Sequence, residues 1–190
     1  MNIENFKPLE GLSYKDVFNK QVALEFMYEP QAKEVFDNFD IDCFADQEEF
    51  KKYAWRVTEE LCESLEALDK NEKNHVYEEL LDGFNFLIEL VNMCGYTADD
   101  MDFSEKPMSG DLRMDILKTI EELGLAANCL KNRAWRQSQY LVDMYVFERR
   151  LKNTFNLYLN LLRTKMTDKE IISCWSLKYQ VNLFRIQTKY

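Results

Sequence analysis

The chain has 190 residues, of which 46% are hydrophobic and 14% aromatic, so it can bury a sizeable core within one domain. Its formal net charge of -10 excludes a general basic surface for DNA or RNA. Five Gly and three Pro are too few for many tight turns, and apolar residues recur three and four apart, so the sequence predicts an all-α, multi-helix bundle over residues 1–190.

The cysteines and the apolar runs indicate where the protein works. The five cysteines include no C-x-x-C pair, and we expect them to be reduced thiols. The polar start MNIENFKPLEGLSYKD is unlike a signal peptide, and no uncharged apolar run is long enough to cross a bilayer. We therefore expect a cytoplasmic protein whose partners include neither a membrane nor a nucleic-acid polymer.

Apolar periodicity predicts the helices in chain order. We expect them at about 14–28, 31–39, 46–68, 75–93, 112–130, 139–163 and 168–185. Asp46 with Glu49, and Thr167 with Glu170, have the spacing of capping boxes that would open the third and the last helix. Residues 95–111 form the longest non-helical connection, which is a candidate for a mobile loop over a site.

Two acidic pairs lie on the neighbouring helices of the stretch 53–93. Glu60 with Glu63, and Glu79 with Asp82, are spaced i,i+3, which places the two carboxylates of a pair about 60° apart on a helix. If the two helices pack antiparallel across the DKNEKN break, four carboxylates meet. Such a group stays ionised only around a positive charge, and oxygen-rich groups suit Mg²⁺, with Mn²⁺ as a substitute.

Either pair alone is typical of a solvated helix face. The second pair, however, shares its side of the helix with Phe86, Leu90 and Met93, and an ordinary solvated face is not apolar. Two such pairs joined by one short connection are more specific than one. The alternatives at this point are a metal site and two unrelated acidic surfaces.

The last helix carries a polar continuation of its apolar stripe. Lys178, Asn182 and Arg185 lie within about 60° of one another on one face. They are either a phosphate- and base-contacting row facing the metal site, or a helix end that emerges into solvent.

The segment KNRAWR places cations beside a Trp. Lys131, Trp135 and Arg136 together can hold a phosphate and stack a base, although a basic interhelical turn with a packing Trp is ordinary. A single histidine and no Cys/His ligand spacing argue against zinc and di-iron sites. The chain also lacks G-x-x-x-x-G-K-[ST], G-x-S-x-G and G-x-G-x-x-G motifs.

Two segments resemble a known family. TEELCES followed by EELLDGFNFLIEL is similar to the E-E-x-x-E … E-x-x-D pattern of the all-α NTP pyrophosphohydrolases, which include MazG-like enzymes, dimeric dUTPases and phage dCTP pyrophosphatases. KYQVNLFRIQTKY resembles the K-x-x-x-N-x-x-R-Q-x-x-G-Y ending of the dUTPase and dCTPase branch, with Ile186 in place of Gln and Lys189 in place of Gly. Gln21 matches the Gln of the N-terminal Q-x-x-L-N motif, whose Asn is Glu25 here. Few residues match the family pattern over 95–165, and this region is expected to be an insertion, a lid or a dimer contact.

The resemblance implies the role of each matching residue. Mg²⁺ would be bound by Glu60, Glu63, Glu79 and Asp82. Phosphates would be held by Lys178 and Arg185, the nucleoside would be read or oriented by Asn182 and Gln21, and Tyr190 would close over the site. The implied reaction is hydrolysis of a deoxynucleoside triphosphate to monophosphate and pyrophosphate, in a homodimer.

Physical chemistry supplies the remaining roles. Glu59 or Glu60 is placed to orient or deprotonate the attacking water, and Trp55 and Trp135 are candidate stacking residues. We therefore predict a Mg²⁺-dependent hydrolase of dUTP or dCTP. The alternatives are a MazG-like enzyme acting on another dNTP and a non-catalytic helical interaction protein.

Overall fold

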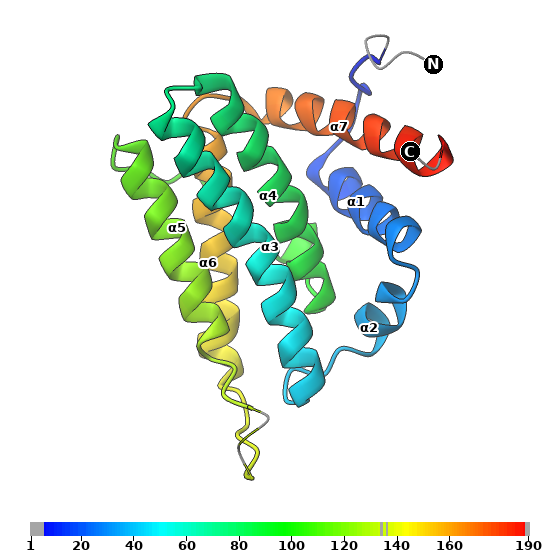
Figure 1. Ribbon diagram of the computed structural model, residues 1–190, viewed down its shortest axis with the longest axis vertical. Coiled ribbons are helices and arrows are strands. Elements are labelled where there is room, and N and C mark those ends of the chain that lie inside the picture. The colour runs from blue at the N-terminus through cyan, green and yellow to red at the C-terminus, as the bar shows by residue number, and fades with distance from the viewer. Residues whose placement is uncertain (1–5, 134, 136, 189–190) are drawn as a thin grey trace.

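The computed structural model describes residues 6–133, 135 and 137–188 (Figure 1). Within these residues the chain forms seven α-helices, one short 3₁₀ helix and no strand, which confirms the all-α prediction. The elements are α1 (Tyr14–Tyr28), α2 (Ala32–Asn38), α3 (Phe44–Asp69), α4 (Lys73–Met93), η2 (Ala98–Asp100), α5 (Leu112–Ala127), α6 (Met144–Leu162) and α7 (Asp168–Thr188).

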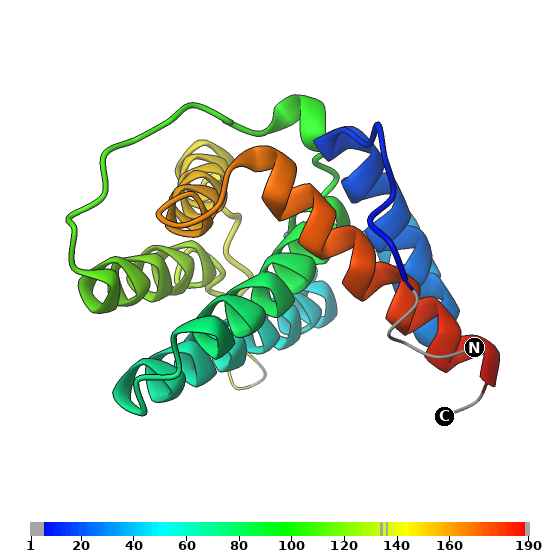
Figure 2. The ribbon, with the colours of Figure 1, turned by 90° about the horizontal axis from the view of Figure 1, so that it is seen from above.

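Four long helices stand side by side, and the three other α-helices among the described residues cover one end and one flank. In Figure 1, α3, α4, α5 and α6 run up and down together, while α1 and α2 lie beside α4 and α3. Viewed from above, α7 crosses the end of this bundle and lies along α1 (Figure 2). The segment before α1 follows α7, where the Leu9 backbone N–H donates to Ser176 Oγ at 3.0 Å and Gln180 Nε2 donates to the Lys7 carbonyl at 2.8 Å.

The turn between α3 and α4 sets these two helices antiparallel, as the sequence predicts. Asn71 adopts a left-handed conformation with φ of 60°, a geometry that Asn tolerates better than most residues. The Glu72 backbone N–H then donates to the Ala67 carbonyl at 2.9 Å, which ends α3 and starts α4 within three residues. α3 and α4 pack together more extensively than any other pair of helices.

The predicted helix ends are right in some places and wrong in others. The capping box at Thr167 and Glu170 is present, since the Thr167 N–H donates to Glu170 Oε2 at 2.8 Å and the Glu170 N–H to Thr167 Oγ1 at 3.3 Å. The capping box at Asp46 is wrong, because α3 already begins at Phe44. Asp46 instead accepts the Asp40 backbone N–H at 2.8 Å and so holds the preceding loop. α5 and α6 are also shorter than predicted, with residues 128–143 between them.

The connection between α4 and α5 is attached along α6. Asn156 Nδ2 donates to the carbonyls of Asp102 and Ser104, both at 2.9 Å, and Asn160 Nδ2 donates to Ser104 at 3.1 Å. Arg163 Nη1 donates to the Phe103 carbonyl at 3.0 Å. In the part of the chain that the structure describes, no helix is both long and apolar enough to span a membrane.

Candidate metal centre and the adjoining cavity

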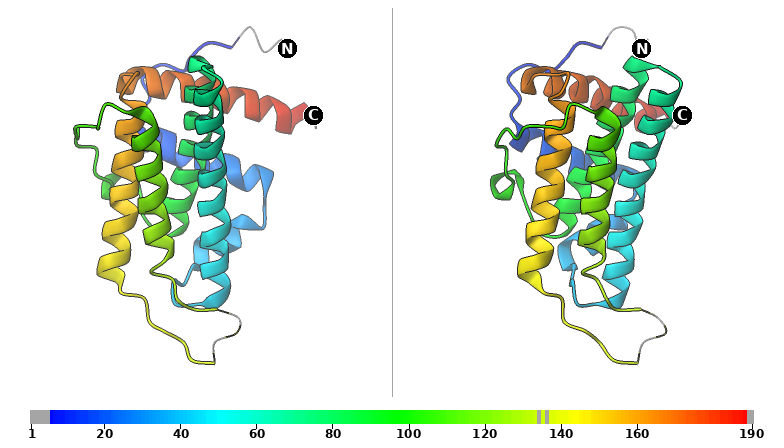
Figure 3. Two further views of the ribbon diagram at one scale, coloured as in Figure 1. Left: turned by 60° about the vertical axis from the view of Figure 1, so that its left-hand side comes forward. Right: turned by 90° about the vertical axis from the view of Figure 1, so that its left-hand side faces the viewer.

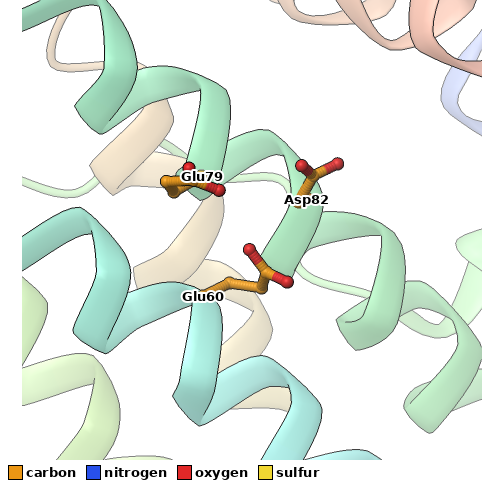
Figure 4. A group of neighbouring side chains, drawn as sticks. All are labelled: Glu60, Glu79 and Asp82. Atoms are coloured by element: carbon orange, nitrogen blue, oxygen red, sulfur yellow. The ribbon is translucent and has the colours of Figure 1, made fainter. Parts of the chain in front are cut away.

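Three carboxylates meet between α3 and α4. Glu60 reaches from α3 toward Glu79 and Asp82 on α4, and one oxygen atom of each lies within 4.8 Å of the others (Figure 4). We call these three residues the carboxylate group. Hard oxygen ligands in a space of this size suit a cation such as Mg²⁺, so the residues present fit a divalent ion.

The electrostatics of the carboxylate group favour a cation. Burial, the Asp82 charge and a hydrogen bond with Glu79 raise the pKa of Glu60 to about 8. Burial also raises the pKa of Asp82, although the Lys178 ammonium opposes that shift. Without further positive charge the carboxylate group therefore retains a proton at neutral pH, and a divalent ion would take its place.

Lys178 brings one cation to the group from α7. Its ammonium forms an ion pair with Asp82 and donates to the Glu78 carbonyl at 3.3 Å. His75, the single histidine, lies one turn before Glu79 on α4, with its Nε2 at 3.0 Å from Glu79 Oε1. The two side chains flank the carboxylate group with basic nitrogens.

A glycine allows the helices to approach behind the carboxylate group. A Cβ at Gly83 would lie 3.0 Å from Glu60 Cβ and would overlap the hydroxyl of Tyr158 on α6. That buried hydroxyl donates to the Leu80 carbonyl at 3.0 Å, and burial together with the three acids raises its pKa well above the usual value. Gly83 therefore fixes the distance across which Glu60 meets the two acids of α4.

The other acidic residues of α3 lie elsewhere. Glu63 is exposed and does not belong to the carboxylate group, although its charge contributes to the raised pKa of Glu60. Glu59 and Trp55 are also exposed, Trp55 to 61%. Of the four predicted metal ligands, the structure thus brings three together.

A cavity of about 460 Å³ adjoins the carboxylate group at Asp82. Gln21 and Asn182, two of the residues expected to bind the nucleoside, line its wall. The site predictions did not include the other polar side chains around it, which are Glu25, Tyr28, Glu29, Arg56, Asn85 and Glu89. Its volume is in the range of small-molecule sites.

A chain of hydrogen bonds fixes the deep wall of this cavity. Trp175 Nε1 donates to Gln21 Oε1 at 3.0 Å, and Gln21 Nε2 donates to Glu89 Oε1 at 2.8 Å. Burial and the neighbouring Glu25 carboxylate raise the pKa of Glu89 well above its usual range. Since α1, α4 and α7 each contribute one of the bonded side chains, this network ties the three helices together.

Arg56 compensates the acids at the opposite wall. Its Nη2 lies 2.5 Å from Glu29 Oε1 and its Nη1 lies 3.3 Å from Glu25 Oε1. Glu25 Oε1 also accepts the Tyr53 hydroxyl at 2.5 Å. One guanidinium thus faces two of the carboxylates that surround the cavity.

The remaining predicted site residues are spread more widely. Arg185 is exposed, donates from Nη1 to Asn182 Oδ1 at 3.4 Å and lowers the pKa of Asp82 through its charge. Lys131 and Trp135 belong to the α5–α6 connection, at the end of the bundle opposite α7 (Figure 3). Within one chain they are therefore not brought to the carboxylate group. Arg136 and Tyr190 lie outside the described residues.

The comparison with protein families identifies the family of this chain. A family model described as dUTPase matches residues 65–190, more than half of the chain. The chain belongs to the dUTPase family. In this dUTPase-family chain the match includes Glu79, Asp82 and all of α7, and it starts after Glu60 and Glu63. No significantly similar protein is found among curated proteins, and none among solved structures.

Proposed function

We propose that this protein is a Mg²⁺-dependent diphosphohydrolase that converts dUTP, dCTP or both to the monophosphate and pyrophosphate. The observation that carries the proposal is the carboxylate group, in which Asp82 forms an ion pair with Lys178 from a helix that also lines the adjoining cavity. Membership of the dUTPase family supports a nucleotide pyrophosphohydrolase.

Different side chains would bind the phosphates and the nucleoside. Glu60, Glu79 and Asp82 would hold Mg²⁺, with Mn²⁺ as a substitute, and the bound ion would neutralise phosphate charge and lower the pKa of a water molecule. Lys178 and Arg185 are placed to attract the triphosphate, while the cavity beyond Asp82 takes the nucleoside against Gln21 and Asn182. Of the two candidates for the general base, Glu60 is better placed, because it faces Glu79 and Asp82 whereas Glu59 is exposed.

The active form is proposed to be a homodimer. The α5–α6 connection and the first turn of α6 expose large side chains, with Trp135 79%, Leu141 85% and Tyr145 75% exposed. Exposed apolar patches are typical of protein interfaces. Sedimentation or light scattering would give the mass directly, and a monomer at micromolar concentration would reject this part of the proposal.

Pyrophosphate release from each of the four dNTPs and dUTP, with and without Mg²⁺, tests the function. We expect release from dUTP or dCTP, and its loss in Glu79→Ala and Asp82→Ala with the helical circular dichroism retained. Glu78→Ala is the matched control, because it removes an exposed carboxylate next to Glu79. Activity confined to another dNTP would indicate a MazG-like enzyme. Inactivity with every nucleotide, and no rise in melting temperature with Mg²⁺ and a non-hydrolysable dUTP analogue, would indicate a non-catalytic interaction protein.

A further inference from the structure

Two buried oxygen atoms in the cavity wall lack a hydrogen-bond donor. Among the residues that the structure describes, nothing donates to Glu89 Oε2 or to Asn85 Oδ1. The side chains are 2% and 7% exposed, and both line the cavity beside Asp82. Native proteins rarely leave buried polar atoms unpaired, because each then loses its hydration without compensation. A ligand in the cavity would supply the missing partners.

The spacing along α4 orders the groups that such a ligand would meet. Asp82, Asn85 and Glu89 follow one another by three and four residues on α4, and all three line the cavity. At 1.5 Å per residue, Glu89 lies about 10 Å farther along the helix axis than Asp82. This step rests on the proposed function: with the phosphates at Asp82, the sugar and base extend toward Glu89. The ring position farthest from the sugar of a pyrimidine nucleotide is C4, which carries an amino group in cytosine and a carbonyl oxygen in uracil.

One atom of Glu89 is free to contact that position. Its Oε1 is occupied by the Gln21 amide, and the Gln21 orientation is fixed in turn by the Trp175 indole N–H. We propose that Glu89 Oε2 reads the substituent at C4 of a pyrimidine base. When ionised, it accepts an N–H from the amino group of cytosine. When protonated, it donates its O–H to the carbonyl oxygen of uracil.

Groups with opposite effects on the ionisation of Glu89 surround its side chain. Glu25 approaches from α1 and Glu29 from the position just after it. Tyr53 and Arg56 approach from α3, and Asp82 lines the cavity from the same helix as Glu89. α7 contributes the uncharged side chains of Trp175 and Asn182. Burial and Glu25 favour the protonated form, whereas Gln21 and the Arg56 charge favour the ionised form.

To test this proposal, kcat/KM is measured for dCTP and for dUTP from pH 6 to 8.5, and the ratio of the dCTP value to the dUTP value is followed against pH. Both substrates carry the same triphosphate and use the same carboxylate group, so ionisation of either cancels in the ratio. For the unmodified protein we expect the ratio to rise with pH by tenfold or more. In Glu89→Gln the new amide oxygen keeps the bond from Gln21, so its N–H₂ group always donates toward the base. That variant should prefer dUTP, with a ratio that no longer depends on pH.

The control is Glu34→Gln, which removes an exposed carboxylate from α2, outside the cavity wall. We expect its ratio and pH dependence to follow those of the unmodified protein. A flat ratio in the unmodified protein, or an equal change in both variants, would overturn the role of Glu89. The first of these outcomes needs no variant, so it holds even if Glu89→Gln fails to fold.

Calorimetric binding of dCMP and dUMP separates this inference from the proposed function. If the protein hydrolyses dUTP and dCTP with a ratio of kcat/KM values that does not change with pH, the proposed function holds and the role of Glu89 in base recognition is refuted. A protein that hydrolyses neither, but binds dCMP over dUMP increasingly as the pH rises, refutes the function and retains the reading. If neither monophosphate binds and neither triphosphate is hydrolysed, both proposals fail.

Discussion

Replacement of Glu60 by Gln should stabilise the protein when no divalent ion is present. The pKa of Glu60 is about 8 in the folded chain against 4.5 for the free group, so folding takes up a proton between these pH values. Stability is therefore lost as the pH rises from about 4.5 toward 8. Glutamine has the shape of the protonated acid and keeps a donor for Glu79 without taking up a proton.

The size of the gain follows from the pKa of Glu60. At pH 7 the linkage amounts to at most about 3 kcal/mol, since each pH unit is worth about 1.4 kcal/mol. Because solvent reaches part of this side chain, we expect about 1–2 kcal/mol, or a Tm higher by about 2–8 °C for a chain of this length.

Thermal melting at pH 7 in EDTA, and again with saturating Mg²⁺, tests the prediction. In EDTA Glu60→Gln should melt above the unmodified protein, and in Mg²⁺ this order should reverse, because the variant has lost a ligand. Glu59→Gln is the control, since it removes an exposed carboxylate from the same turn of α3. Equal melting temperatures of Glu60→Gln and the unmodified protein in EDTA, from pH 6 to 8, would refute the electrostatic reasoning.

Three further predictions concern the walls of the site. Gly83→Ala should destabilise the fold by about 1–3 kcal/mol in urea titrations, because the added methyl group meets the Tyr158 hydroxyl. Gly124→Ala is the control and should be neutral or stabilising, because the space around Gly124 in α5 is open. Lys178→Gln should raise the pKa of Asp82 further, which carboxyl NMR titration would detect, and should raise KM for the triphosphate more than it lowers kcat. An unchanged Asp82 titration would show that the ion pair is absent in solution. Trp175→Phe should keep the fold but lose the hydrogen-bond donor to Gln21, so that the ratio of kcat/KM for dCTP to that for dUTP becomes less dependent on pH. A pH dependence like that of the unmodified protein would show that Gln21 is held in another way.

The sequence predicted the helices and the acidic centre because both depend on local periodicity. Glu60, Glu79 and Asp82 are brought together by two adjacent helices and a three-residue turn, so their meeting depends on few long-range contacts. Glu63 shows the limit of this reasoning. Two residues spaced i,i+3 are rotated by about 60° from each other around the helix axis. Where two helices pack closely, this rotation is enough to place one side chain between the helices and the other in solvent.

The cavity wall could not be predicted in the same way. Glu25, Arg56 and Glu89 come from three helices, and their meeting depends on how those helices rotate about their axes. The one local signal was Glu89 itself, an acid within the apolar run FNFLIEL, where a charge is costly unless it has a function or a partner. The misplaced cap at Asp46 has a similar cause, because the Asp40 N–H competed for its carboxylate.

The position of α7 has a consequence for the order in which the protein is made. The ammonium beside Asp82 and the indole that fixes Gln21 both belong to this helix, which follows every other described element in the chain. During synthesis α3 and α4 therefore leave the ribosome and can pair before the Lys178 ammonium exists. Premature termination before Lys178 would release a bundle in which Asp82 lacks its ion-pair partner.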